Sequence, residues 1–229
     1  MPEPGPGAPQ RGVFVVFEGP EGAGKSTQIS RLAERMTAAG RDPLVTREPG
    51  GTPLGAVLRQ LVLDPARRVS PLTELLLYAA DRADHVSEVI EPNLAAGRDV
   101  ISDRYTGATV AYQGHGRGLD LALIAELNER ATGGLKADLT ILLDLPPELG
   151  LRRVEGRLRP GSSGGGGARR DRLEAEDLAF HLRVRDGFRA MAAADPTWLV
   201  VDASTSEESV ARSIWQELAA RLGAGSGNL

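Results

Sequence analysis

The sequence predicts an α/β domain of three layers, α/β/α, built on a five-stranded parallel sheet. Short apolar runs alternate along the chain with longer segments of helical spacing, and a glycine-rich loop joins the first run to the first such segment. This alternation is typical of parallel sheets with helices on both faces. The 229 residues are enough for one well-buried domain. We expect this domain at 12–222, with Gly- and Pro-rich disordered tails at 1–11 and 223–229.

Five short runs are predicted to be the strands. They are mostly apolar along their length instead of alternating, which is typical of strands buried on both faces. The runs are residues 12–18, 43–46, 99–102, 138–144 and 197–201.

Three longer segments between and after these runs have helical spacing: 70–95, 119–131 and 206–222. The first opens with Ser70-Pro71, a helix-capping residue followed by proline at the first helical position. It places apolar residues on one face, which we expect to be buried. They are Leu72, Leu75, Leu76, Ala79 and Ala83.

Composition narrows the class of protein. The net charge of −4 argues against a protein that coats nucleic acid or an anionic membrane. The absence of cysteine excludes disulfides and thiolate metal sites. Residues 1–11 lack the apolar stretch of a signal peptide, and no segment approaches the ~20 apolar residues of a membrane span. We therefore expect a soluble, cytoplasmic protein with no nucleic-acid or membrane partner.

The loop after the first predicted strand matches the phosphate-binding pattern G-x-x-x-x-G-K-S. Its glycines allow successive N–H groups to face phosphate oxygens at a helix N-terminus. Lys25 is placed to reach the β- and γ-phosphates of ATP. The predicted ATP-binding residues are Gly19, Pro20, Glu21, Gly22, Ala23, Gly24, Lys25, Ser26 and Thr27.

Two large classes of nucleoside-triphosphate-binding protein fit poorly. A GTPase would carry Asn-Lys-x-Asp, and no asparagine in the chain is followed directly by lysine. A motor-type ATPase would end a second apolar strand with paired acids, whereas the candidate strands end in Ser102-Asp103-Arg104 and Leu143-Asp144-Leu145. Phosphoryl transfer to a small acceptor remains.

Residues 152–172 break the pattern, with seven arginines around a Gly/Ser run. An interdomain linker is one interpretation. The 57 residues that follow would make a domain too small to be stable alone, however. A mobile LID at about 152–173 that closes over substrate fits better.

Further motifs lie beyond the phosphate loop. They are T-R-E-P-G-G-T at 46–52, Y-A-A-D-R at 78–82, D-R-Y at 103–105, A-Y-Q-G-H-G-R-G at 111–118 and D-R-L-E at 171–174. Together with the phosphate loop they resemble bacterial thymidylate kinases, over roughly residues 12–218. The resemblance implies the P-loop nucleoside monophosphate kinase fold. It also implies transfer of phosphate from ATP to dTMP with Mg²⁺, and a homodimer that could pair through 70–95 and the 106–131 region.

The acceptor side is predicted from arginines at strand ends. Arg47 and Arg104 each end a predicted strand, where ligands bind in open α/β sheets and guanidinium forks can hold a phosphate. The alternative is ion pairing with Glu48 or Asp103. The resemblance implies that Arg47 and Arg104 bind the dTMP phosphate.

The resemblance also implies the residues that recognise the nucleoside. Arg82 would hydrogen-bond the thymine, and Tyr78 would stack on it where the family usually has phenylalanine. Thr109 and Gln113 would contact the pyrimidine edge and the sugar region. The family's loop carboxylate, here Glu21, would contact the deoxyribose 3′-hydroxyl; an ion pair with a nearby arginine is the alternative.

The predicted metal ligands are Ser26 and Asp103. The alternative for Asp103 is that it only forms an ion pair with Arg104. The phosphate loop has no arginine between its glycines, so the resemblance implies that a LID arginine stabilises the transferred phosphoryl group. The predicted catalytic residues are Lys25, Asp103, Arg104, Arg157 and Arg159. Arg170 and Arg172 are the next LID candidates, and Arg153 and Arg169 complete the set.

Two other functions stay open on sequence alone. One is a kinase for another nucleoside monophosphate or for a deoxynucleoside. The other is a non-catalytic nucleotide-binding regulator, although Lys25, Arg47 and Arg104 are all present.

Overall fold

The fold is that of a computed structural model, which describes residues 11–158 and 170–225. Five parallel strands form one sheet in the order β2-β3-β1-β4-β5, which confirms the predicted sheet. The strands are β1 (Phe14–Glu18), β2 (Leu44–Arg47), β3 (Val100–Asp103), β4 (Leu139–Asp144) and β5 (Trp198–Asp202).

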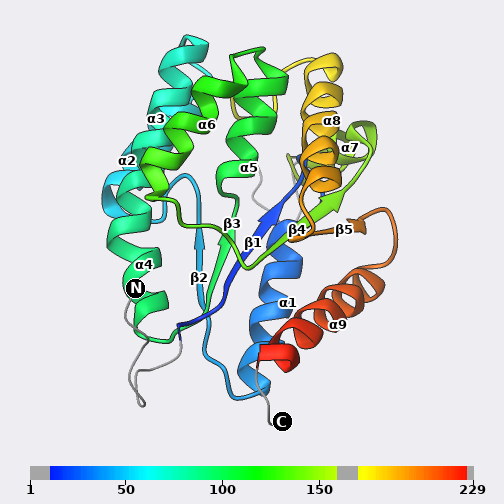
Figure 1. The fold of residues 1–229 in the computed structure, drawn as a ribbon. Helices are drawn as coiled ribbons and strands as arrows, with labels where there is room; N and C mark the ends of the chain where they lie inside the picture. The colour runs from blue at the N-terminus through cyan, green and yellow to red at the C-terminus, as the bar shows by residue number, and fades with distance from the viewer. Residues whose placement is uncertain (1–10, 159–169, 226–229) are drawn as a thin grey trace.

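Helices cover both faces of the sheet (Figure 1). They include two π-helical segments, η1 and η2, which continue neighbouring α-helices. The helices are α1 (Lys25–Ala38), α2 (Pro53–Leu63), α3 (Pro71–His85), η1 (Val86–Ile90), α4 (Glu91–Ala95), α5 (Thr106–Thr109), η2 (Val110–Gly116), α6 (Leu121–Thr132), α7 (Pro147–Leu158), α8 (Leu178–Ala194) and α9 (Glu207–Gly225).

The central strand β1 shows how the three layers are held together. Val15 and Phe17 belong to a core that includes apolar residues of α1 and α9. Phe14 and Val16 belong to a second core that includes apolar residues of η1 and α4. Because successive side chains of a strand point to opposite faces, one apolar run serves both layers.

The prediction that every strand is buried on both faces was wrong for the runs 43–46 and 197–201. These runs form β2 and β5, which lie at the two edges of the sheet, and their Val45 and Val200 are 48 % and 51 % exposed. Composition alone does not give strand order, so an apolar edge strand resembles an apolar central one.

Residues 71–95 are helical throughout, and Ser70 caps α3 by accepting a hydrogen bond from the N–H of Thr73, 3.2 Å away. The expected buried face was wrong, however. Leu75 is buried, whereas Leu72 and Leu76 are about half exposed. The buried face of α3 instead carries polar residues that belong to the site described below.

The chain after β4 differs from expectation at two places. The predicted LID begins at 152, but residues 152–158 belong to α7, and the rest of the segment up to residue 169 lies outside the described residues. Helix α9 continues to Gly225, beyond the predicted domain end at 222. No helix within the described ranges has the length and apolar character needed to cross a membrane.

Candidate active site

The phosphate loop between β1 and α1 depends on glycine at several positions. Gly19, Gly22 and Gly24 have φ angles of 139°, 70° and 91°, which other residues rarely adopt. A Cβ atom on Gly22 would also lie 2.3 Å from the carbonyl oxygen of Gly150 in α7. The loop is therefore built for close backbone approach at the N-terminus of α1, where N–H groups attract anions.

Lys25 is the first residue of α1 and folds back over this loop. Its Nζ donates hydrogen bonds to the carbonyl oxygens of Gly19 and Pro20, at 3.0 and 3.1 Å, and the residue is buried. Burial lowers its pKa, and the nearby positive charge of Arg104 lowers it further. An anionic ligand in the loop would raise this pKa again, because it would attract the ammonium charge.

A cavity of about 280 Å³ opens above the loop, and we call it the phosphate cavity. It brings together most of the residues predicted to bind phosphate or metal, which are Lys25, Ser26, Arg47, Asp103, Arg104 and Arg157. The remaining lining residues are Glu21, Gly22, Ala23, Gly24, Thr27, Glu48, Arg59, Asp171 and Glu174.

Arg59 of α2 was not predicted. Its Nη1 donates to the carbonyl oxygen of Pro49 at 3.0 Å, and its side chain lines the cavity beside Arg47 and Arg104. Arg47 is exposed, and none of the ion pairs found among the described residues involves it, so the expected alternative of an Arg47–Glu48 pair is not what the structure shows.

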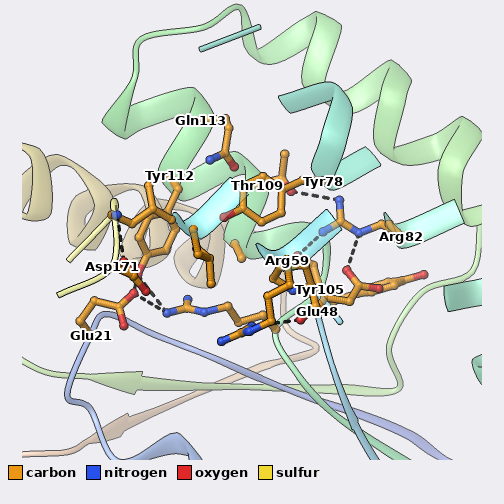
Figure 2. Close-up of a pocket in the computed structure, with 15 residues that line it drawn as sticks. Glu21, Glu48, Arg59, Tyr78, Arg82, Tyr105, Thr109, Tyr112, Gln113 and Asp171 are labelled. Carbon is orange, nitrogen blue, oxygen red and sulfur yellow. Dashed lines mark hydrogen bonds and ion pairs between the residues drawn. The ribbon is translucent and has the colours of Figure 1, made fainter. Parts of the chain in front are cut away.

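A second cavity adjoins the first, and we call it the acceptor pocket (Figure 2). Glu21, Glu48, Arg59, Arg104 and Asp171 line both cavities. The other residues of the acceptor pocket are Pro49, Leu63, Tyr78, Arg82, Tyr105, Ala108, Thr109, Tyr112, Gln113 and Leu173. All of the residues predicted to recognise the nucleoside are therefore in its wall.

Arg104 joins the two cavities. It is the one described non-glycine residue with positive φ, 76°, and its N–H is held by the carbonyl oxygen of Phe17 at 2.9 Å. Its guanidinium donates to the Gly19 carbonyl, to Glu21 and to the Tyr112 hydroxyl, at 3.1, 2.7 and 3.0 Å. Strained backbone of this kind is found where the surroundings hold a functional side chain in place.

Glu21 faces the acceptor pocket from the phosphate loop (Figure 2). Its Oε1 accepts hydrogen bonds from Arg104 and from the Tyr112 hydroxyl, 2.6 Å away. Burial opposes its ionisation, but attraction by Arg104 and then Lys25 outweighs burial and lowers its pKa to about 2. Glu21 therefore faces the acceptor side and is also paired with an arginine.

Arg82 is almost completely buried at the far wall of this pocket. It donates to Glu48, Thr109 and Asn128 and to the carbonyl oxygen of Tyr105, at 2.9, 3.0, 2.7 and 2.8 Å. A guanidinium has five N–H groups, so these bonds leave one on Nη2. Thr109 uses its hydroxyl oxygen as an acceptor for this arginine.

Asp103 ends β3 beside Ser26 in the phosphate cavity. Its Oδ1 is buried and has no hydrogen-bond partner among the described residues, and no ion pair joins it to Arg104 there. Ser26 is exposed to the same cavity. A buried carboxylate oxygen without a described partner, in the same cavity lining as a hydroxyl, fits a hydrated cation held between protein and phosphate.

Glu18, the last residue of β1, supports this region from below. Its Oε1 accepts hydrogen bonds from the N–H groups of Tyr105 and Ala108, at 3.0 and 2.9 Å, which anchors the chain that follows Arg104. Burial raises its pKa to about 7, although the charge of Arg104 opposes the shift.

The LID arginines are divided between different places. Arg157 lines the phosphate cavity, and Arg159 lies outside the described residues. Arg170 pairs with Glu155 on the side of α7. Arg172 does not line the phosphate cavity. Its guanidinium donates hydrogen bonds to the carbonyl oxygen of Val62 and to Glu74, next to the acceptor pocket.

Arg153, another LID candidate, does not line the phosphate cavity and makes a different contact. Its guanidinium donates to the carbonyl oxygens of Gly22 in the phosphate loop and Ala203 after β5, at 3.2 and 3.3 Å. It therefore joins the phosphate loop to the β5–α9 connection.

Comparison with known proteins agrees with this geometry. A sequence model of the family described as thymidylate kinase matches residues 17–214. The thymidylate kinase of Deinococcus radiodurans is 50 % identical over 212 residues, covering 92 % of this chain and 98 % of that protein. Those of Synechococcus sp. strain JA-2-3B'a(2-13) and Geotalea uraniireducens are 53 % and 48 % identical, covering 92 % and 93 % of this chain and 96 % and 100 % of theirs. The chain belongs to the thymidylate kinase family.

Proposed function

We propose that this protein transfers the γ-phosphoryl group of ATP to the phosphate of dTMP, giving ADP and dTDP. The observation that carries the proposal is the junction of two cavities at Arg104: one above the glycine-rich loop, the other lined by Tyr78, Arg82 and Gln113. A donor phosphate and an acceptor phosphate would meet at that junction. Membership of the thymidylate kinase family supports dTMP as the acceptor.

On the donor side, the N–H groups of the loop and the Lys25 ammonium would hold the β- and γ-phosphates. Lys25 would exchange its two carbonyl contacts for phosphate oxygens. Phosphoryl transfer depends mainly on positioning and on stabilising charge on the moving group, so a loop that presents N–H groups and an ammonium to the phosphates suits the reaction.

Ser26 and Asp103 would hold Mg²⁺, Ser26 directly and Asp103 directly or through water. When bound, Mg²⁺ supplies positive charge that neutralises the phosphate oxygens. The protein's own part is to keep the orphaned Asp103 oxygen and the Ser26 hydroxyl on one side of the cavity.

On the acceptor side, Arg47, Arg59 and Arg104 would bind the dTMP phosphate. All three line the phosphate cavity, and two of them also line the acceptor pocket. Glu21 holds the Arg104 guanidinium and faces the acceptor pocket, so it can also accept a hydrogen bond from the deoxyribose 3′-hydroxyl.

The base would lie between Tyr78 and the opposite wall, stacked on the Tyr78 ring. The remaining N–H of Arg82 would bind a thymine oxygen, and Gln113 would contact the pyrimidine edge. Thr109 would act by holding Arg82 in place.

Among the described LID candidates, Arg157 would stabilise the transferred group, and its place in the lining of the phosphate cavity supports this role. An arginine in this role contributes about 10³–10⁵ in rate in other phosphoryl-transfer enzymes.

Two copies of the chain are proposed to form a homodimer through α2, α3 and α6, which lie together at one side of the molecule (Figure 1). The support is a group of apolar side chains that are roughly half exposed on these helices. They are Leu54, Val57, Leu72, Leu76, Leu121 and Leu123. Burial between two copies would remove this apolar surface from water.

The test is a coupled ADP-release assay with ATP, Mg²⁺ and a panel of nucleoside monophosphates and deoxynucleosides. We expect dTMP to give the highest kcat/KM, and Lys25→Met to remove turnover while leaving the thermal midpoint close to that of the wild type. A preference for another acceptor would overturn the proposal. Binding of ATP without turnover on any acceptor would indicate a regulator instead.

A further inference from the structure

Glu74, on α3, is a completely buried acid next to the acceptor pocket. Its carboxylate contacts three side chains that come from different parts of the chain. Gln113 Nε2 donates to Oε1 at 2.6 Å, Arg117 donates to both oxygens at 3.3 Å, and Arg172 donates to Oε2. A buried carboxylate is expensive unless it is paired, and this one is paired twice.

Only one of these three partners lines the acceptor pocket, and that is Gln113. Because a carboxylate beside two guanidinium groups can only accept hydrogen bonds, the amide of Gln113 must turn its nitrogen toward Glu74. The amide oxygen is then the head-group atom left for a ligand, and none of the hydrogen bonds found among the described residues uses it. Figure 2 places the Gln113 head group above Thr109 and Tyr78, at the edge of the pocket.

The same carboxylate fixes the wall of the pocket. Arg172 also donates from Nε to the carbonyl oxygen of Val62 at 2.9 Å, and its N–H bonds the carbonyl oxygen of Leu63 at 3.2 Å. The neighbours Leu63 and Leu173 both line the acceptor pocket. Glu74 therefore joins α3, the end of α2, η2 and the segment 170–174 around the place of the base.

We propose that Glu74 is a positioning residue for base recognition, holding the Gln113 amide so that its carbonyl oxygen faces the pyrimidine. This inference rests on the proposed function, since it takes a pyrimidine monophosphate as the acceptor. An amide oxygen accepts from the N3–H of a thymine or uracil ring. The N3 of cytosine is itself an acceptor, so it would face the fixed oxygen without a hydrogen bond, and a buried polar atom left unpaired discriminates strongly.

The variant Glu74→Gln keeps the size of the side chain and removes the charge that fixes the amide. A glutamine at 74 can either donate or accept, so Gln113 can turn its nitrogen to the pocket. We expect the ratio of kcat/KM for dTMP to that for dCMP to fall by about tenfold. The expected loss lies mainly in KM for dTMP, while KM for ATP stays within about twofold of the wild type.

A double variant, a control variant and a Gln113→Leu background separate positioning from folding. Glu74→Gln with Arg172→Gln removes one guanidinium together with the carboxylate, so fewer unpaired charges stay buried. Glu217→Gln, which removes the acid of a partly exposed Glu217–Arg221 pair on α9, is the matched control. In a Gln113→Leu background, Glu74→Gln is expected to leave the dTMP:dCMP ratio unchanged, because the amide through which it acts is gone.

The positioning role would be overturned if the ratio of kcat/KM for dTMP to that for dCMP stayed unchanged, as it does when both values fall equally. It would also be overturned if neither Glu74 variant folded. Glu74 would then be a structural ion pair. If the wild type phosphorylates no pyrimidine monophosphate, the proposed function fails separately. Calorimetric binding of dTMP and dCMP to the same variants then decides the role of Glu74, with an unchanged binding ratio overturning it.

Discussion

Nη2 of Arg104 lies 2.7 Å from Oε1 of Glu21, so an ion pair joins the phosphate loop to the end of β3. The Tyr112 hydroxyl donates to the same Oε1, and the Arg104 guanidinium lies 4.9 Å from the centre of the Tyr112 ring. The acid inside the phosphate loop thus lines the acceptor pocket as well as the phosphate cavity. It orients both an arginine and a tyrosine of the acceptor pocket.

Replacing Glu21 with alanine is expected to weaken dTMP much more than ATP. The change frees the Arg104 guanidinium and the Tyr112 hydroxyl, both of which face the acceptor, while the loop N–H groups that would hold ATP stay in place. We expect KM for dTMP to rise on the order of 10- to 100-fold, from the loss of charge-assisted hydrogen bonds. KM for ATP should change by less than about threefold.

Steady-state kinetics with each substrate varied in turn measures this split. Glu34→Ala, which removes an exposed acid on α1 that lines neither cavity, is the control for loss of a glutamate. Equal increases in both KM values would contradict the assignment of Glu21 to the acceptor side.

Arg157→Ala is expected to lower kcat on the order of 10³-fold with saturating substrates. An arginine that acts on the moving phosphoryl group makes its strongest contact in the transition state, so KM for ATP should change little. Arg152→Ala is a matched control, since Arg152 is exposed on the same helix and does not line the phosphate cavity. An unchanged kcat in Arg157→Ala would move the role to another LID arginine.

Leu76→Glu is expected to convert a dimer into a monomer. Leu76 is 48 % exposed on α3, and a charge there would be buried in the proposed interface without a partner. Sedimentation equilibrium gives the mass of the particle, and Leu182→Glu, on α8 with 40 % exposure, is the control. A wild type that is monomeric at micromolar concentration, or a dimeric Leu76→Glu variant, would rule out this interface.

Local patterns predicted most of the fold and much of the site. The phosphate loop, the strand ends and the helix start at Ser70 are encoded by neighbouring residues, and the structure has each of them. Arg59 was missed because it has no motif of its own and reaches the cavity only through the placing of α2.

The errors have a common physical origin in tertiary packing. The spacing on α3 suggested a buried apolar face, but Glu74, Asp81, Arg82 and His85 are buried in its place. Each of the latter three finds partners from distant parts of the chain, as Arg82 does with Glu48 and Asn128. Hydrophobic periodicity gives no sign of a polar core, because the partners that make burial possible are not neighbours in sequence.

Glu18 is expected to make the stability of the protein fall as pH rises through the neutral range. Its pKa is raised by burial from 4.5 to about 7, so the native state keeps a proton that the unfolded chain has already lost. The favourable contribution is complete below about pH 4.5 and disappears as pH rises toward 7. At about 1.4 kcal/mol for each unit of pKa, the wild type should lose about 3 kcal/mol relative to a variant that cannot ionise.

Glu18→Gln is that variant. Its amide oxygen can still accept from the N–H groups of Tyr105 and Ala108, and the cost of its unpaired amide nitrogen does not depend on pH. Urea unfolding of both proteins from about pH 5 to pH 8 gives the difference in unfolding free energy at each pH. Asp81, whose pKa burial raises to about 6, titrates in both proteins and cancels in that difference. Parallel curves for the two proteins would show that Glu18 is already ionised in the native state at pH 5, and that Arg104 outweighs burial there.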